Sequence, residues 1–376
     1  MKKLLPEVCT IQHGFPFDSA KFSDSEGVPL IRIRDVVRGY SETFTTEEYK
    51  DEFLVHESDL LVGMDGEFNI AKWGKTPALL NQRVCRLMPK TNIDKGYLFY
   101  FMPTALKKIE EKTPFVTVKH LSAKELNKIE IPILPVDEQK KIATVLDKVS
   151  DLISCREQQL VKLDELVKAR FVEMFGDPVY NEMHWETKRL IDICRTIVDC
   201  PHSTPHYTTK DTGYKCIRTS AVKKNKILWE KVECISKQEY EERIKRKRPE
   251  KGDVIYTREG AILGIAAVID RDYNVALGQR SMLLSPDIYK CTPCFLSMAM
   301  NFDSFLGKAL GGVSGSASPH INVGDIKALE IIAPPIEIQN QFSTFVERVD
   351  QQKQTVQQSL EKLELMKKAL MQEYFG

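Results

Sequence analysis

The stretch IEIPILPVDEQ, residues 129–139, returns almost unchanged as LEIIAPPIEIQ, residues 329–339. From these stretches the two halves of the chain match without a gap as far as Gly176 and Gly376. A long ungapped match within one chain indicates an internal duplication. We therefore interpret the chain as two copies of one module.

Upstream of these stretches the match is weaker and its offset drifts, because the second copy is longer. Matched segments nevertheless follow one another in the same order in both copies: Ile31-Arg32 with Ile217-Arg218, 59–66 with 253–260, Gln82-Arg83 with Gln279-Arg280, and His120-Leu121 with His320-Ile321. Each copy thus has a variable globular part followed by a well-matched tail.

Both tails have the pattern of a long helix. Pro135 and Pro335 end an extended segment and suit a helix start. Apolar residues then recur at spacings of three and four, without Gly or Pro, until Gly176 and Gly376. This predicts two helices of roughly 35–40 residues, each with one apolar stripe, and the simplest partners for these stripes are each other because the two helices are matched in length. The predicted contact residues are Gln139, Ile142, Val149, Leu160 and Leu163 in the first helix, and Gln339, Phe342, Val349, Leu360 and Leu363 in the second.

The globular parts contain short β-rich runs separated by turn residues, such as VPLIRIRDVV from Val28 and GDVIYTREG from Gly252. Helical stretches are expected at 96–111 and 294–307. The predicted fold class is α+β, with a mostly antiparallel sheet in each globular part. The predicted domains are 1–134 and 179–334 for the globular parts, with 135–178 and 335–376 for the helices.

Several catalytic motifs are missing from the sequence. It has no phosphate-binding loop, no dinucleotide-binding fingerprint and no nucleophile elbow. Cys291 and Cys294 have redox or zinc-type spacing, and Cys200 with His202 and His206 could also hold a metal. Isolated Cys and His residues are more often packing or surface residues, so we expect no metal site and a protein that is not an enzyme.

The bulk composition is that of an ordinary globular protein. No apolar run approaches the roughly 20 residues of a membrane span. The nine cysteines show no framework spacing, which favours a reducing cytoplasm. The net charge is only +1, but the tails are acidic and the second globular part is basic. Its basic run 242–251 is either a solvated face or a phosphate-facing stripe.

Polar and charged residues gather where the predicted strands end. Their side-chain types match base edges in the major groove, and the small residues of the loop 311–322 suit backbone contacts. For each one, a structural salt bridge or a turn cap is the competing interpretation. The predicted DNA-binding residues are Arg32, Arg34, Asp65, Glu67, Asn69, Lys72, Gln82, Arg83, Lys119 and His120 in the first copy, and Arg218, Ser220, Lys223, Arg258, Glu259, Gln279, Arg280, Ser314, Ser316 and His320 in the second.

Two non-identical modules, each followed by a long helix with this start, resemble the specificity subunits of type I restriction–modification systems. The motif reads Ile131-Pro132, Pro135 and Glu138-Gln139 in the first copy. In the second copy it reads Pro334-Pro335 and Gln339, with Ile338 in place of the Glu. The run MFGDP at 174–178 is also typical of that family. The resemblance covers essentially the whole chain.

The resemblance implies that each globular part is a target-recognition domain for one half of a split sequence in double-stranded DNA. The helices would pack as an antiparallel coiled coil, set the spacing of the half-sites and dock two methyltransferase subunits through the contact residues named above, and restriction subunits would join later. No cofactor would be bound by this chain, since S-adenosylmethionine, ATP and Mg²⁺ belong to the partners. The alternative is a scaffold whose two modules bind proteins and not DNA.

Overall fold

The computed structural model describes residues 1–113, 119–260, 262–311 and 320–376. These residues form two compact units, and each is considered by itself. The first unit comprises 1–158 and 357–376, and the second comprises 159–356. Both long helices are therefore divided between the units, whereas the domains expected from the sequence keep each helix whole.

The two long helices are α5 (Val136–Phe175) and α11 (Ile336–Phe375), each of 40 residues. The predicted helices are thus confirmed, and at 1.5 Å per residue each is about 60 Å long. Acidic residues occupy both first turns, where the helix dipole favours them. Gly176 follows α5 with φ +73°, the left-handed conformation that glycine adopts easily at a helix end.

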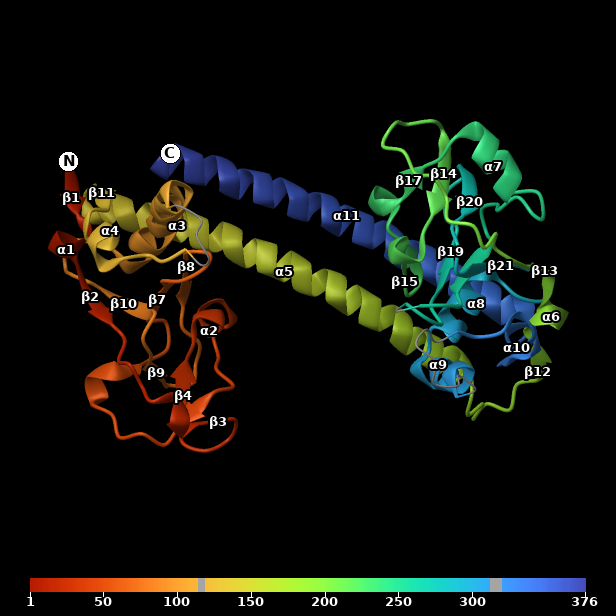
Figure 1. Ribbon diagram of the computed structural model, residues 1–376, viewed down its shortest axis with the longest axis horizontal. Coiled ribbons are helices and arrows are strands. Elements are labelled where there is room, and N and C mark those ends of the chain that lie inside the picture. Colours follow the sequence, from red (N-terminus) through yellow and green to blue (C-terminus); the bar gives the residue numbers. More distant parts are fainter. Residues whose placement is uncertain (114–118, 261, 312–319) are drawn as a thin grey trace. The chain divides into compact units, whose positions relative to one another are not determined.

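The first unit is built on two sheets (Figure 1). Leu60 and Val62 face the core beneath helix α3 (Lys95–Lys112), while Leu61 between them packs with Ile31 and Leu80 of the second sheet. This is the alternation expected of a strand with both faces covered. The sheets are β2 (Cys9–His13), β10 (Val84–Pro89), β7 (Leu60–Gly63) and β8 (Asn69–Lys72), and then β3 (Phe22–Ser23), β5 (Phe44–Thr45), β4 (Val28–Ile31), β9 (Ala78–Leu80) and β6 (Leu54–Val55).

Short helices and a two-stranded pair complete the first unit. The pair joins β1 (Lys2–Leu4) to β11 (Glu130–Pro132), so the beginning of the module lies beside the start of its long helix. The helices are α1 (Leu5–Val8), α2 (Ile33–Arg38), α3 (Lys95–Lys112) and α4 (Ala123–Asn127), with 3₁₀ turns at Ser19–Lys21 and Asp51–Phe53.

The second unit repeats this plan with more elements. Its main sheet is β13 (Cys194–Asp199), β21 (Ser281–Pro286), β18 (Val254–Thr257) and β19 (Ala266–Val268), and its second sheet is β17 (Glu233–Cys234), β14 (Tyr214–Ile217) and β20 (Asn274–Leu277). The remaining elements are β12 (Thr187–Arg189) with β22 (Glu330–Ile332), β15 (Val222–Lys223) with β16 (Lys226–Ile227), α6 (Leu190–Ile193), α7 (Lys237–Arg243), α8 (Pro293–Met300), α9 (Asp303–Leu310), α10 (Val323–Ala328), and 3₁₀ turns at Thr219–Ala221 and Trp229–Lys231.

The α+β class with two repeated modules and mostly antiparallel sheets is confirmed, with two local differences. The run from Val28 is a strand only to Ile31, because the Asp35 carboxylate accepts from the Arg32 backbone N–H (2.9 Å) and starts helix α2. The expected helix 294–307 breaks after Met300. There the buried Asn301 amide donates to Ala266 O (2.7 Å) and to Ser297 O (2.9 Å), which ties the end of α8 to β19.

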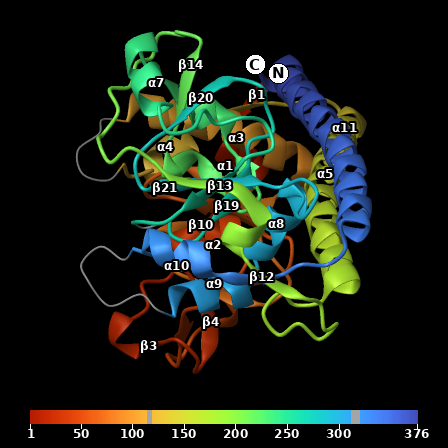
Figure 2. The same ribbon diagram turned by 90° about the vertical axis from the view of Figure 1, so that its right-hand side faces the viewer.

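In both units the start of one long helix packs with the end of the other, as Figure 1 and Figure 2 let the reader follow. In the first unit Leu146 of α5 and Phe375 of α11 share a core. In the second, Phe171 of α5 contacts Phe342 of α11, with ring centroids 5.5 Å apart. The helices are therefore antiparallel within each unit. In the part of the chain that the structure describes, no helix is both long and apolar enough to span a membrane.

Candidate nucleic-acid interface

One edge of each second sheet carries a pair of arginines. Strands β4 and β9 are parallel, as are β14 and β20, so the carboxyl ends of each pair meet at one edge. Arg32 follows β4, and Arg83 follows β9 after two residues. Arg218 and Arg280 follow β14 and β20 in the same way. The sequence matches that singled out these four residues therefore correspond to equivalent positions in the two units.

The turn that holds Arg83 and Arg280 is the same in both units. Arg83 has φ +72° and Arg280 has φ +70°, which is the left-handed region that few side chains adopt. The Arg83 carbonyl accepts from Met64 N (2.9 Å), and the Arg280 carbonyl accepts from Arg258 N (3.0 Å). Both arginine side chains are exposed.

A histidine lies beside each of these turns. His120 forms a β-bridge with Asp65, and His320 forms the equivalent bridge with Glu259. The next residue in each copy donates its N–H to the turn, Leu121 to Met64 O (2.7 Å) and Ile321 to Arg258 O (3.0 Å). In both units the acid and the histidine are thus bridged next to the turn that holds the arginine.

The acidic residue has different partners in the two units. In the first unit the Asp65 carboxylate hydrogen-bonds to His120 Nδ1 and lies 3.7 Å from Arg83 Nε. In the second unit Glu259 pairs instead with Arg258 (2.8 Å). The difference arises because Met64 of the first copy is replaced by Arg258 in the second.

Arg258 itself is buried, and its side chain is only 7% exposed. Its Nε and Nη2 donate to the two carboxylate oxygens of Asp199 at 2.9 and 3.2 Å. His202 lies on the same carboxylate, with Nε2 3.1 Å from Oδ2. This bidentate pair ties β13 to the end of β18. The placement of Arg258 favours a structural role over base recognition.

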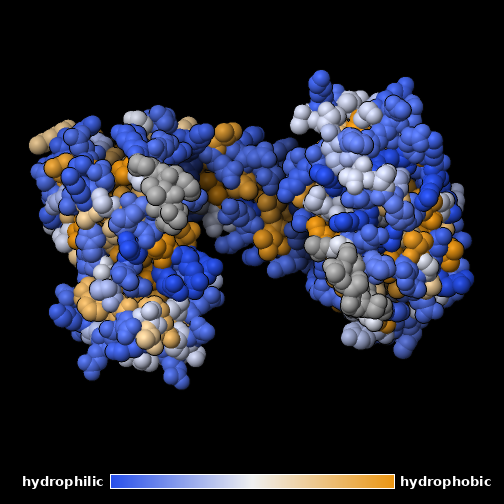
Figure 3. Space-filling model, in the orientation of Figure 1, coloured by the Kyte–Doolittle hydropathy of each residue, from blue (hydrophilic) through white to orange (hydrophobic). Residues whose placement is uncertain are grey.

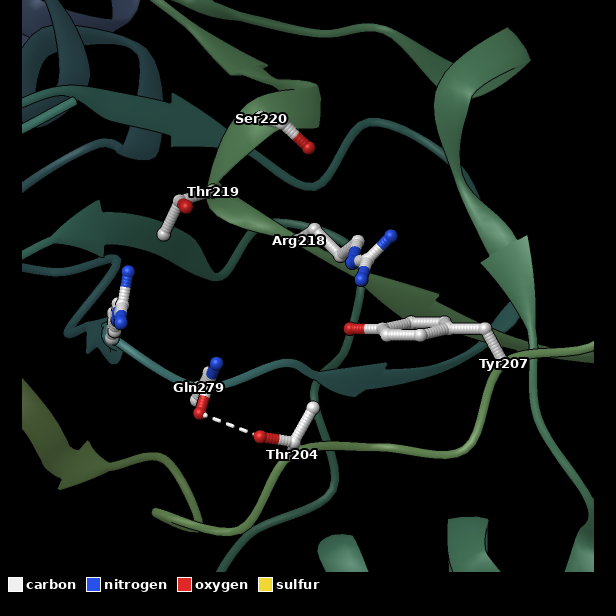
Figure 4. A pocket seen from close by; sticks show the side chains of 7 residues that line it. Thr204, Tyr207, Arg218, Thr219, Ser220 and Gln279 are labelled. Atoms are coloured by element: carbon white, nitrogen blue, oxygen red, sulfur yellow. Dashed lines mark hydrogen bonds between the residues drawn. The ribbon is translucent and has the colours of Figure 1, made fainter. Parts of the chain in front are cut away.

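A pocket of about 200 Å³ opens at the strand ends of the second unit (Figure 4). The Arg218 guanidinium lies 3.9 Å from the centre of the Tyr207 ring, and its Nη1 donates to Glu233 (2.6 Å). Thr204 Oγ1 donates to Gln279 Oε1 (3.2 Å). The lining residues are Thr204, Tyr207, Arg218, Thr219, Ser220, Gln279 and Arg280, four of which the sequence had singled out.

Tyr207 and Thr204 were missed because no matched segment of the repeat includes them, whereas Thr219 directly follows the matched pair Ile217-Arg218. Burial raises the pKa of the Tyr207 phenol, so the ring under Arg218 stays uncharged. A neutral aromatic face beside an arginine is a platform on which planar groups can stack.

Other predicted DNA-binding residues lie away from these strand ends or have partners of their own. Lys72 pairs with Asp147 of α5 (3.3 Å), and Lys119 donates to Glu110 O (3.0 Å). Asn69 donates to Glu67 O (3.1 Å). The remaining residues are Arg34, which pairs with Asp35, and Gln82 and Lys223, which are exposed; Ser314 and Ser316 lie outside the described residues.

The basic run 242–251 is largely paired within itself. Lys245 bonds to Glu242 (2.6 Å), and Lys247 bonds to Glu250 (2.9 Å). The buried Arg243 donates to Ser203 O. These contacts favour the solvated-face interpretation over a phosphate-facing stripe.

The cysteines and histidines considered above as metal ligands are buried or lie beside other side chains. Burial raises the pKa of Cys294 to about 12, and it raises the pKa of Cys291 well above the ordinary value of a thiol. His206 lies 3.7 Å from Glu239. Among the described residues, no group of three or more His, Cys, Asp or Glu side chains is arranged to hold a metal ion.

The predicted helix-contact residues mostly face inward. Gln139 and Gln339 are fully buried. Leu163, Phe342 and Val349 belong to the core of the second unit, and Leu160 packs against it. Ile142 packs against the core of the first unit, while Val149 and Leu360 are buried and Leu363 is half-buried. Apolar groups reach the surface of the long helices in Figure 3. The exposed large apolar residues of these helices are Val145, Leu152, Val161, Leu166, Val172, Leu365 and Met366.

Known proteins are similar to this chain over most of its length. The EcoBI specificity subunit of a type I restriction enzyme from Escherichia coli is 29% identical over 374 residues, covering 92% of this chain and 78% of that protein. The MjaVIII specificity subunit from Methanocaldococcus jannaschii is 24% identical and covers 91% of this chain and 87% of its own.

Solved structures share the fold. The S subunit of a type I restriction–modification system from M. genitalium has a TM-score of 0.60 at 13% identity, over 100% of this chain and 96% of that one. A chain from a study of type I restriction–modification complex assembly has a TM-score of 0.56 at 16% identity, over 100% and 97%. A family model described as the type I restriction modification DNA specificity domain matches residues 1–165 and, again, 182–365. Both copies of the module are matched, and the chain belongs to the family of type I restriction–modification DNA specificity proteins.

Proposed function

We propose that this chain is the DNA-specificity subunit of a type I restriction–modification complex. Each module recognises one half of a bipartite target in double-stranded DNA. The chain itself is not an enzyme, and it directs the chemistry of its partners to a chosen sequence. The family membership of both copies is the broad support for this function.

One observation of the structure carries the proposal. Each unit presents the same arginine pair at the carboxyl ends of a parallel strand pair, Arg32 with Arg83 and Arg218 with Arg280. Around the pairs the two copies differ, since Met64 is replaced by Arg258. Two similar but non-identical polar surfaces on one chain suit two different half-sites, with side chains that can contact phosphates and base edges.

The long helices serve as the spacer between the half-sites. Supporting this role, each helix is continuous over 40 residues and contributes to both compact units. A stiff spacer couples two weak half-site interactions into one strong bipartite interaction, because binding of one half raises the effective concentration of the other.

Two methyltransferase subunits dock on the helices, and restriction subunits join the complex. The exposed apolar residues of the helices, among them Leu152 and Leu365, support a docking role. The predicted contact residues such as Gln139 and Phe342 are occupied by internal packing, so docking relies on their exposed neighbours. The partners bring S-adenosylmethionine, ATP and Mg²⁺, and the complex works in the cytoplasm, where its DNA is.

The competing function is a protein-binding scaffold, which the family membership does not favour. The test is single-molecule sequencing of methylated adenines in cells with and without the gene. Loss of methylation at one split motif on deletion supports the proposal and identifies the target. Unchanged methylation, together with binding to partner proteins that is insensitive to salt, would support the scaffold.

A further inference from the structure

The internal repeat separates two classes of residue at the interface. The globular parts have diverged over most of their length, yet Arg83 and Arg280 remain identical and occupy the same turn. A residue that is the same in both modules cannot distinguish one half-site from a different one. Such a residue suits a task that both modules share, and the chemical group common to both half-sites is the phosphate backbone.

The backbone conformation of the two arginines supports a functional reason for their presence. Both have φ near +70°, where glycine or asparagine would sit with less strain than arginine. Their main-chain role, accepting from Met64 N or Arg258 N, needs no particular side chain. Packing does not require the guanidinium either, because both side chains are exposed. The Arg280 side chain is therefore available to a group outside the chain, whereas Arg83 also contacts Asp65 and His120.

The charge around the two arginines differs. Asp65 lies 3.7 Å from Arg83 and partly neutralises it. In the second unit Arg258 takes up both Asp199 and Glu259, and among the described residues no carboxylate lies within ion-pair distance of Arg280. A cation without a counter-ion attracts phosphate more strongly, so the second module has the stronger anion-binding position.

We propose that Arg83 and Arg280 contact the DNA phosphate backbone independently of base sequence, and that Arg258 acts as a positioning residue that leaves Arg280 free for the stronger contact. Discrimination between bases then belongs to the neighbours that differ between copies, such as Tyr207 beside Arg218. This inference rests on the proposed function and assigns different tasks to residues of the same surface.

The test uses the full-length chain purified with its partner subunits. Binding is measured to duplexes that carry the methylated motif, to single-base-pair variants of that motif, and to a random duplex, between about 50 and 200 mM salt. Arg280→Asn fits the left-handed turn and removes the charge, whereas Arg280→Lys keeps the charge. Arg195→Asn, at an exposed arginine on β13, is the matched control for losing one charge in the same unit.

We expect Arg280→Asn to weaken binding to every duplex by the same factor and to lower the salt slope by about 0.9. Arg280→Lys should retain most of the slope, because a phosphate accepts a point charge whereas bidentate base recognition needs the guanidinium. Arg83→Asn should have a smaller effect, and Asp65→Asn should strengthen binding to all sequences. If Arg280→Asn unfolds the unit, Arg280→Gly fits the same turn and serves instead.

Three results would overturn the inference. Arg280→Asn could relax the requirement at one base pair, which would make Arg280 a base reader. Arg280→Asn and Arg195→Asn could lower the salt slope by the same amount, which would show that Arg280 makes no phosphate contact beyond that of a control arginine. If the wild-type complex binds no DNA, the proposed function fails together with the inference, whereas the first two results leave the proposed function intact.

Discussion

Gln139 and Gln339 make the same hydrogen bonds in the two units. Gln139 Oε1 accepts from Asp94 N (2.8 Å), and Gln339 Oε1 accepts from Thr292 N (2.9 Å). Their Nε2 groups donate to Leu134 O and Pro334 O, both at 2.8 Å. Asp94 and Thr292 are the N-caps of α3 and α8. The glutamine of the repeated stretch therefore joins the long helix to the globular part beside it.

Replacing Gln139 with Leu should destabilise the first unit. The substitution leaves the partly buried Asp94 N–H and Leu134 carbonyl without these partners, and the cost is at most about 1–3 kcal/mol for each group. Urea unfolding of the full chain measures the loss, and Lys140→Ala, at an exposed neighbour, is the control. A Gln139→Leu variant as stable as the wild type would show that these hydrogen bonds are not needed.

Removing the aromatic side chain at the end of α11 should destabilise the first unit. Phe375 packs on Tyr97 and Phe101 of α3, with ring centroids 5.2 and 6.0 Å apart. We expect Phe375→Ala to cost about 3–5 kcal/mol and to raise hydrogen exchange in α3 (Lys95–Lys112). Helix α8 in the second unit is the internal reference and should exchange as before. Faster exchange in α8 alone would contradict the assignment of Phe375 to the first unit.

Arg258→Ala should act on stability before it acts on recognition. It leaves the Asp199 carboxylate, 13% exposed, without its bidentate partner, and losing one side of a buried pair costs about 3–5 kcal/mol. Thermal unfolding of Arg258→Ala, Asp199→Asn and the double variant should show that the stability losses of the two single variants do not add, which is the sign of a strong coupling between the two residues. If Arg258→Ala keeps full stability and relaxes one half-site, Arg258 is a base reader after all.

Shortening one helix should change the spacing that is recognised. Deleting seven residues between 150 and 170 preserves the helical face but shortens the spacer by about 10 Å. We expect methylation at the native motif to disappear, as measured by sequencing methylated adenines. A seven-residue insertion in the exposed turn 24–26, at the amino end of β4, leaves the helices intact and should not change the spacing. Methylation of the native motif by the shortened helix would refute the spacer role.

The cysteines give a test at fixed pH. Burial raises the pKa of Cys9, Cys85 and Cys194 to about 12, so at pH 8 these thiols remain protonated and react slowly. Cys155 on α5 is exposed. Iodoacetamide at pH 8 should therefore modify Cys155 in the folded chain and the other cysteines only in urea, as read by mass spectrometry. Rapid labelling of Cys294 would instead support a reactive Cys-x-x-Cys pair.

The sequence alone determined the duplication, the two long helices and the class of fold. These features follow from local patterns, namely proline before the helix, apolar spacing along it and glycine at its end, and they need no knowledge of distant contacts. The matched pairs Arg83 with Arg280 and His120 with His320 were also visible, because the repeat compares the chain with itself.

The tertiary structure alone decided what each polar residue does. Arg258 and Arg280 are both arginines that follow a strand of the second unit. Arg258 is buried against Asp199, whereas Arg280 is exposed. Asp199 lies 59 residues before Arg258 in the sequence, so no local pattern could predict their contact. Which arginine is free to bind DNA is set by where the strands bring the carboxylates, and that depends on the fold as a whole.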